Sequence, residues 1–287
     1  MITKDYFKGW YFKCTDEDKT IAFIPAYHQS GGMGSASLQI ITDDEVYNVP
    51  IGSFECREKS LYIKAGNCLF TNNGIELDIK SEPLTMKGSL RFQELSPIKY
   101  DIMGPFALIP FMQCRHTVCS MRHRVDGEVI VNGTRYSFSD GIGYSEGDSG
   151  RSFPRRYIWT QSAFDNGSLM LSVANIPLLG MSFTGIIGVV MLDGKEYRVA
   201  TYLGAKIKHI GDNTVTVKQG DYQLTAKLIK KKAHPLRAPV CGSMSRTIHE
   251  SAACKAYYRF SHRDDVICEF VSDRASFEFE YASQRLV

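Results

Sequence analysis

The segments Ser37-Leu-Gln-Ile-Ile-Thr-Asp-Asp44-Glu-Val-Tyr47-Asn-Val49 and Gly188-Val-Val-Met-Leu-Asp193-Gly-Lys-Glu-Tyr197-Arg-Val199 decide the fold. Each places an acidic turn between two apolar, β-branched runs, a pattern typical of a β-hairpin. The turn aspartates are separated by 193 − 44 = 149 positions and the closing valines by 199 − 49 = 150 positions. A nearly constant offset over a whole hairpin indicates an internal duplication.

Two further pairs of segments extend this repeat. Gly74–Lys80 resembles Gly220–Lys227, and Trp10–Lys13 resembles Tyr157–Gln161. The rest of the chain also alternates apolar and polar residues with period two between Gly, Asn and Asp turns, as around Asn132-Gly133. Because no long segment has a helical apolar stripe, we expect an all-β protein with few short helices.

A duplicated half must hide its sheet edges, so each sheet is expected to curl toward closure and the two to pack together. The sequence therefore predicts two tandem antiparallel β-barrel or half-barrel domains, residues 1–104 and 105–287. We place the junction in Ser96–Cys114, where three prolines interrupt an apolar stretch. Glu196–Leu203 is predicted to be a strand of the second domain.

Composition excludes several classes of protein. The hydrophobic fraction of 44% and the charged fraction of 23% are those of a folded globular chain. A net charge of +3, with only Lys230–Lys232 forming a basic run, argues against a nucleic-acid partner. Met1–Tyr6 lacks a secretory signal and Ile176–Leu192 is broken by Pro177, so we expect a cytoplasmic protein without an integral membrane span. Transient membrane contact, and either a monomer or a dimer, remain compatible with the sequence.

The connection Asp140–Gln161 has the greatest chemical variety, with carboxylates, arginines, tyrosines and a tryptophan between two predicted strands. A carboxyl group there, Glu146 or Asp148, desolvated beside Tyr144 and Trp159, would act as a general acid. The alternative is that both carboxylates pair with nearby arginines and only hold the connection together.

No metal site is expected. Cys114, His116, Cys119 and His123 share a neighbourhood, but strand geometry directs some of their side chains to opposite faces. Gly31–Gly34 lacks the Lys-Ser/Thr of a phosphate loop.

Three ordered motifs resemble the tocopherol cyclase family. They are Phe7-Lys-Gly-Trp10-Tyr-Phe-Lys13, Gly143-Tyr-Ser-Glu146 through Phe153-Pro and Tyr157-x-Trp-x-Gln161, and Pro235-Leu-Arg-Ala-Pro239. The resemblance implies two lipocalin-like half-barrels and proton-initiated ring closure on a prenyl lipid. Such chemistry needs a strong acid in a dry aromatic pocket, and no metal or redox cofactor.

The resemblance and the residue types of these segments together predict roles for individual residues. Tyr144, Glu146 and Asp148 are expected to be catalytic, whereas the residues expected to contact a small hydrophobic (prenyl or polyene) ligand are Trp10, Phe153, Arg155, Tyr157, Trp159 and Gln161. The family has Lys-Asn-Trp after the glutamate where this chain has Gly147-Asp-Ser149. We therefore hypothesise acid-catalysed cyclisation (cycloisomerase) or hydration of an isoprenoid lipid. The alternatives are a non-catalytic carrier of a hydrophobic ligand and an interaction module that uses exposed β edges.

Overall fold

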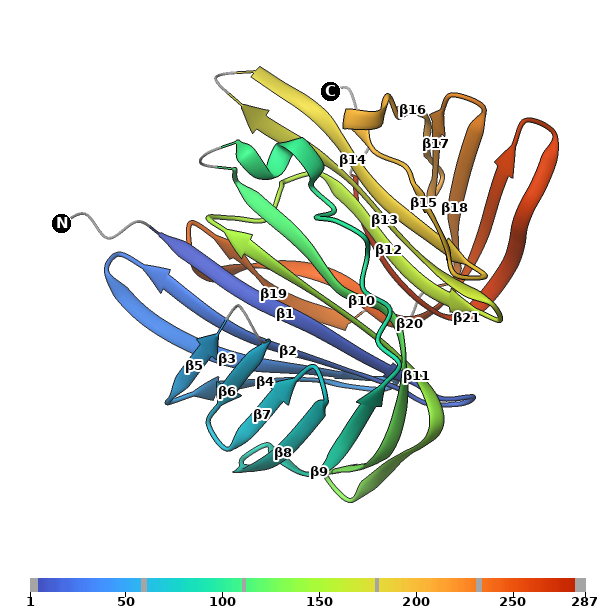
Figure 1. The fold of residues 1–287 in the computed structure, drawn as a ribbon. Helices are drawn as coiled ribbons and strands as arrows, with labels where there is room; N and C mark the ends of the chain where they lie inside the picture. The colour runs from blue at the N-terminus through green and yellow to red at the C-terminus, as the bar shows by residue number, and fades with distance from the viewer. Residues whose placement is uncertain (1–4, 58–60, 110–111, 179–180, 231–233, 282–287) are drawn as a thin grey trace. The chain divides into compact units, whose positions relative to one another are not determined.

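The computed structural model describes residues 5–57, 61–109, 112–178, 181–230 and 234–281. Over these residues the chain is almost entirely β-strand, and it forms two antiparallel sheets that each curl into a half-barrel (Figure 1). The predicted all-β class with two half-barrel sheets is confirmed. The helices found here are two short 3₁₀ turns, η1 (Gly104–Leu108) and η2 (Thr201–Leu203), and neither could cross a membrane.

The first sheet has eleven strands in the order β4-β3-β2-β1-β11-β10-β9-β8-β7-β6-β5. Their bounds are β1 Tyr6–Thr15, β2 Thr20–Ser30, β3 Met33–Thr42, β4 Val46–Ile51, β5 Phe54–Arg57, β6 Tyr62–Ala65, β7 Cys68–Thr71, β8 Gly74–Ser81, β9 Leu84–Gln93, β10 Cys114–Val131 and β11 Thr134–Gly150.

The second sheet has ten strands, nine of them in the order β15-β14-β13-β12-β21-β20-β18-β17-β16, with β19 paired to β20. Their bounds are β12 Tyr157–Phe164, β13 Gly167–Leu178, β14 Met181–Leu192, β15 Lys195–Arg198, β16 Lys206–Gly211, β17 Thr214–Gln219, β18 Tyr222–Lys230, β19 His234–Val240, β20 Ser243–His262 and β21 Asp265–Glu280. The strand predicted over Glu196–Leu203 ends earlier, because the amide of Ala200 donates to Gln219 and the chain turns into η2. Lys230 ends β18, and the next two lysines lie outside the described residues.

The strand orders of the two sheets correspond over nine strands, from β4 to β7 in the first sheet and from β15 to β16 in the second, as the duplication predicts. Among the described strands, β5, β6 and β19 fall outside this correspondence. The β3–β4 hairpin occupies the place of β14–β15, and β1, which carries Trp10, occupies the place of β12, which carries Trp159. The alignment of Gly74–Lys80 with Gly220–Lys227 was wrong by one strand. Those segments are β8 and β18, whereas the order of the sheets matches β8 with β17 and β9 with β18. Strands with the same period of two resemble one another whatever their place in a sheet.

The chain divides into two compact units that are discontinuous in sequence. The first comprises Met1–Ile98, His116–Ser152 and Leu236–Arg246, and the second Lys99–Arg115, Phe153–Pro235 and Thr247–Val287. A single boundary after residue 104 does not describe this division, because β10 and β11 pair with β9 and β1 and so complete the first sheet. The expected junction Ser96–Cys114 contains one of several places where the chain passes between units.

Each unit has its own hydrophobic core on one face of its sheet. In the first unit, Trp10, Phe12 and Cys14 of β1 point toward this core, and in the second unit Leu169 and Leu171 of β13 do so. Because side chains alternate along a strand, the residues between these lie on the opposite face. Among the candidate site residues described below, those of β11 and β12 (Tyr144, Glu146, Asp148, Tyr157, Trp159 and Gln161) lie on those opposite faces, which are also largely buried, whereas Trp10 lies in the core.

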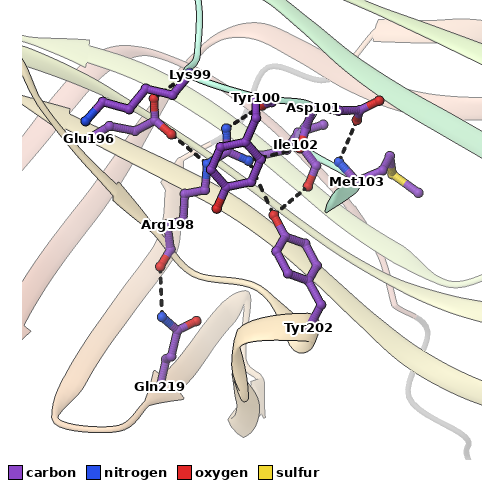
Figure 2. Close-up of polar contacts among 9 residues, drawn as sticks. All are labelled: Lys99, Tyr100, Asp101, Ile102, Met103, Glu196, Arg198, Tyr202 and Gln219. Carbon is purple, nitrogen blue, oxygen red and sulfur yellow. Dashed lines mark hydrogen bonds and ion pairs between the residues drawn. The ribbon is translucent and has the colours of Figure 1, made fainter. Parts of the chain in front are cut away.

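Arg198 of β15 holds the segment Tyr100–Asp101 against the second sheet (Figure 2). Its guanidinium donates to the main-chain carbonyls of Tyr100 and Asp101 and pairs with Glu196, Nε to Oε1, at 2.6 Å. The Tyr100 ring lies 3.4 Å from the guanidinium carbon. A planar, multidentate donor suits this fixed set of acceptors, so Arg198 has a structural role.

The segment Leu236–Arg246, here called the strap, belongs to the first unit although it follows most of the second in sequence. The Gln39 side chain accepts a hydrogen bond from the Arg237 amide at 2.9 Å and donates to the Arg237 carbonyl at 3.1 Å. At the turn after β19, Gly242 has φ +72°, and a Cβ there would lie 1.9 Å from the carbonyl oxygen of Gln29. The motif Pro235–Pro239 thus includes Arg237, whose backbone binds the Gln39 side chain of β3.

Candidate proton-transfer site

Strand β11 separates two kinds of residue onto its two faces. Tyr144, Glu146 and Asp148 lie on the face away from the core, and glycines and serines alternate with them on the core face. Gly143 and Gly147 leave space on the core face that larger side chains fill: a Cβ at Gly143 would lie 2.1 Å from Nε2 of His123, and one at Gly147 2.9 Å from the Trp10 ring. The small residues of the motif therefore make room for packing, and its polar residues point the other way.

Trp10 does not share a face with the candidate acids. It is 6% exposed, belongs to the core of the first unit and stacks on Phe54 with ring centroids 6.3 Å apart. Its Cα partner across the strands is Gly147, whereas Glu146 lies opposite Tyr11 on the other face. The expectation that Trp10 lines the pocket of the acid is not supported by this register. Its place in the core matches a packing role.

His116 of β10 brings the two candidate acids together. Its Nδ1 lies 3.0 Å from Oδ1 of Asp148, and its Nε2 lies 3.1 Å from Oε2 of Glu146. The Tyr144 hydroxyl donates to the same oxygen of Glu146. His116, Tyr144 and Glu146 are 7%, 1% and 5% exposed. The four side chains form one continuous polar cluster, here called the His116 cluster.

The charge of His116 is set by two opposing effects. Burial disfavours the imidazolium, but the negative charges of Glu146 and Asp148 and the hydrogen bonds to both favour it more strongly, so the pKa of His116 is raised well above its usual 6.5. Burial, followed by the charge of Glu146, raises the pKa of Tyr144 well above its usual 10. At neutral pH the cluster therefore holds a protonated imidazole and a protonated phenol around Glu146.

His116, Glu146 and Asp148 are also residue types that bind metal ions, and one ligand atom from each lies within 4.8 Å of the others. The two carboxylates, however, contact different nitrogens of the imidazole ring. A metal ion on either nitrogen would sit beside one of them, whereas a protonated imidazole forms an ion pair with both. The arrangement fits an imidazolium between two carboxylates better than a metal centre.

The neighbouring strand β1 adds a second cation to the same face. Lys13 lies opposite Tyr144 and Tyr11 opposite Glu146, and both side chains are buried, at 4% and 7% exposed. Gly9 lies opposite Asp148, where a Cβ would be 3.3 Å from Cβ of Ala26. These residues belong to Phe7–Lys13, the first motif of the resemblance.

In the second unit, β12 carries Tyr157, Trp159 and Gln161 on the face away from its core. The Tyr157 hydroxyl donates to Glu278 of β21, and Trp159 lies opposite Glu278 across the strands. Tyr157, Trp159, Gln161 and Glu278 are all at least nine-tenths buried. Because β12 and β21 occupy the places of β1 and β11, this second polar face is the counterpart of the face of β1 and β11 that carries Tyr11 and Glu146.

The two remaining predicted ligand contacts lie in the connection between β11 and β12. Phe153 is half-buried and packs edge-on against Tyr157, with ring centroids 6.1 Å apart, and its carbonyl accepts a hydrogen bond from Gln113. Arg155 is exposed. The structure thus groups Phe153 with Tyr157 in the second unit and groups Tyr144, Glu146 and Asp148 in the first.

Comparison with known proteins decides the family. A family model described as tocopherol cyclase-like matches residues 84–280, more than half of the chain. The chain belongs to the tocopherol cyclase-like family. A search of curated proteins finds no match.

Solved structures share the fold of this tocopherol cyclase-like chain. CghA with Sch210972 has a TM-score of 0.61 at 9% identity, covering 97% of this chain and 89% of that one. Kievitone hydratase from Nectria haematococca has a TM-score of 0.55 at 9% identity, with the same coverages. A putative AttH from Nitrosomonas europaea has a TM-score of 0.55 at 9% identity, covering 96% and 93%. These likenesses confirm the fold.

Sequence reasoning missed His116, which it considered only as a ligand of a metal site and then rejected. A signal was present in the hairpin that joins β10 to β11. Its two-residue turn, Asn132-Gly133, has positive φ at both positions, so Val131 and Thr134 face each other. Counting back equal numbers of residues along both strands from this turn pairs His116 with Ser149, next to Asp148 in sequence, so the turn indicates the neighbourhood of His116 but not the face on which its side chain lies.

Proposed function

We propose that this protein catalyses a proton-initiated reaction, ring closure or hydration, on an alkene of an apolar prenyl-type lipid. The observation that carries the proposal is the His116 cluster, in which a buried carboxyl group, Glu146, is held between a protonated imidazole and a protonated phenol. Membership of the tocopherol cyclase-like family supports this type of substrate. It does not choose between ring closure and hydration.

In the proposed reaction the imidazolium of His116 gives its proton to the Glu146 carboxylate, and the carboxyl group so formed passes this proton to one alkene carbon. The π electrons form the new C–H bond, and the other carbon becomes a carbocation. A hydroxyl oxygen of the same molecule, or water, then forms a C–O bond to the cation and loses its proton to the carboxylate. No electron is transferred, so the reaction needs neither oxidant nor reductant. Ring closure gives an isomer of the substrate, and hydration adds one water.

His116 and Tyr144 keep this acid in place. The Tyr144 hydroxyl fixes one oxygen of Glu146, and the imidazolium of His116, 3.1 Å from the same oxygen, is the proton source next to it. Asp148 holds the other nitrogen of the ring at 3.0 Å and so stabilises the charged form of His116. These contacts favour the catalytic hypothesis, because both carboxylates meet a proton donor here.

The test is conversion of a geranylated hydroquinone by the purified protein, followed by chromatography and mass spectrometry. Glu146→Gln should lower the rate roughly 10²- to 10⁴-fold, as expected for loss of a general acid. The matched control is Glu55→Gln in the same unit, where the carboxylate is exposed and pairs with Arg57, and it should leave the rate unchanged. Binding of the lipid without any conversion would favour the carrier alternative, and equal rates for Glu146→Gln and wild type would exclude Glu146 as the acid.

A further inference from the structure

The side-chain amide of Gln161 in β12 is buried, and its oxygen accepts no hydrogen bond from the described residues. The side chain is 2% exposed, and within the described part of the chain its Oε1 has no hydrogen-bond partner. Buried polar atoms in proteins are almost always satisfied by protein, water or ligand, because an unpaired one costs a large desolvation penalty. We therefore expect the Gln161 oxygen to accept a hydrogen bond from a molecule that is not part of the protein.

The surroundings of Gln161 describe what that partner must be. Its neighbours across the strands are Met170 and Ser276, both fully buried, and the Ser276 hydroxyl is already used in donating to the carbonyl of Ala252. Two positions before Gln161 on the same face lies Trp159. The nearest neighbours thus combine an aromatic ring, a methionine side chain and a serine whose hydroxyl is already used, and they leave one free acceptor oxygen on Gln161.

We propose that Gln161 accepts a hydrogen bond from a hydroxyl group of an apolar ligand, a phenol or an alcohol, and that Trp159 packs against the ligand beside it. An amide oxygen accepts from O–H, and an ether or hydrocarbon at the same place would leave it unsatisfied. The inference rests on the proposed function in taking the ligand to be the lipid substrate. It adds the residue that recognises a hydroxyl group of this substrate, Gln161, and so a contact in the second unit that the proposed acid chemistry does not require.

The experiment measures binding of 4-octylphenol and of its methyl ether, 4-octylanisole, by quenching of tryptophan fluorescence. Neither probe has an alkene outside its aromatic ring, so the result does not depend on Glu146 or on turnover. Wild type should bind the phenol more tightly, by roughly 2- to 12-fold, the range that a single net hydrogen bond gives. Gln161→Met, which keeps the size of the side chain, should abolish that preference.

Gln219→Met is the matched control in the same unit. Gln219 uses both ends of its amide inside the protein, donating to the carbonyl of Arg198 and accepting from the amide of Ala200, each at 2.9 Å. Its replacement should lower the Tm and leave the preference for the phenol intact, whereas Gln161→Met should leave the Tm unchanged.

Two outcomes would overturn the inference. One is that wild type binds the phenol and the ether equally, or binds neither. The other is that Gln161→Met keeps the preference, or lowers the Tm as much as Gln219→Met does, which would identify a structural water as the partner. Failure of the proposed acid catalysis would leave these binding results unchanged, so the two failures are distinguishable.

Discussion

Replacement of His116 by glutamine tests the charge state of the His116 cluster through stability. In the unfolded chain a histidine titrates at about pH 6.5, whereas the folded pKa of His116 is raised well above that value by Glu146 and Asp148. Between the two pKa values the folded state holds one proton that the unfolded state lacks. The stabilisation is therefore complete below about pH 6.5 and is lost as the pH rises toward the folded pKa.

The magnitude follows from this proton difference. In wild type, the contribution of His116 to the free energy of unfolding should fall by about 1.4 kcal/mol per pH unit above about pH 6.5. From pH 6.5 to pH 8 this amounts to roughly 2 kcal/mol. His116→Gln should lack this slope. Tyr144 and Cys119 contribute little to this slope between pH 6.5 and 8, because their unfolded-state pKa values, about 10 and about 8.5, already lie above that range.

The assay is urea unfolding at several pH values between 5 and 9. The chain has two tryptophans, so a Trp159→Phe background leaves Trp10, in the core of the first unit, as the reporter. His123→Phe is the control, because burial lowers the folded pKa of His123 to about 4. Its stabilising contribution is present above about pH 6.5 and is lost as the pH falls toward 4.

The two histidines should therefore give slopes of opposite sign in separate pH windows. A difference between wild type and His116→Gln that stays constant from pH 6.5 to 9 would refute the reasoning, since it would mean that His116 is neutral between its carboxylates.

Three further substitutions each test one contact inside a single unit. Arg198→Met should lower the stability of the second unit by about 3–5 kcal/mol, because it strands a buried carboxylate, and Arg198→Lys should restore it only in part; urea unfolding measures both. Gly143→Ala should cost about 1–3 kcal/mol by clashing with His123, and adding His123→Ala should recover much of that loss; additive costs would show that the two residues do not touch. Gln39→Leu should speed hydrogen exchange at the Arg237 amide roughly 10- to 100-fold, and unchanged exchange would mean that Gln39 does not hold the strap.

The sheets could be predicted from the sequence because their determinants are local. Alternation with period two and the turn residues give the strands, and the repeat between Ser37–Val49 and Gly188–Val199 gives the correspondence of β3–β4 with β14–β15. The wrong match of Gly74–Lys80 shows the limit of assigning equivalent strands from local sequence pattern. Any two amphipathic strands match in pattern, and only their order in the sheet says which are equivalent.

The site was predicted in part. The motif correctly marks β11 and β12 as the strands that carry buried polar side chains, and alternation alone would have separated Trp10 from Glu146 once the pairing of β1 with β11 was known. That pairing joins residues that are far apart in sequence, so no local pattern specifies it. For the same reason the alternative interpretation paired the carboxylates with arginines of the same connection, whereas His116, which contacts both, comes from β10.

The most direct test of proton transfer by this cluster is conversion of the geranylated hydroquinone in heavy water. The account predicts that the product formed by wild type carries one solvent deuterium on the former alkene carbon, and that Glu146→Gln forms almost no labelled product. A product without deuterium on that carbon would contradict the account, because the reaction would then proceed without protonation of the alkene.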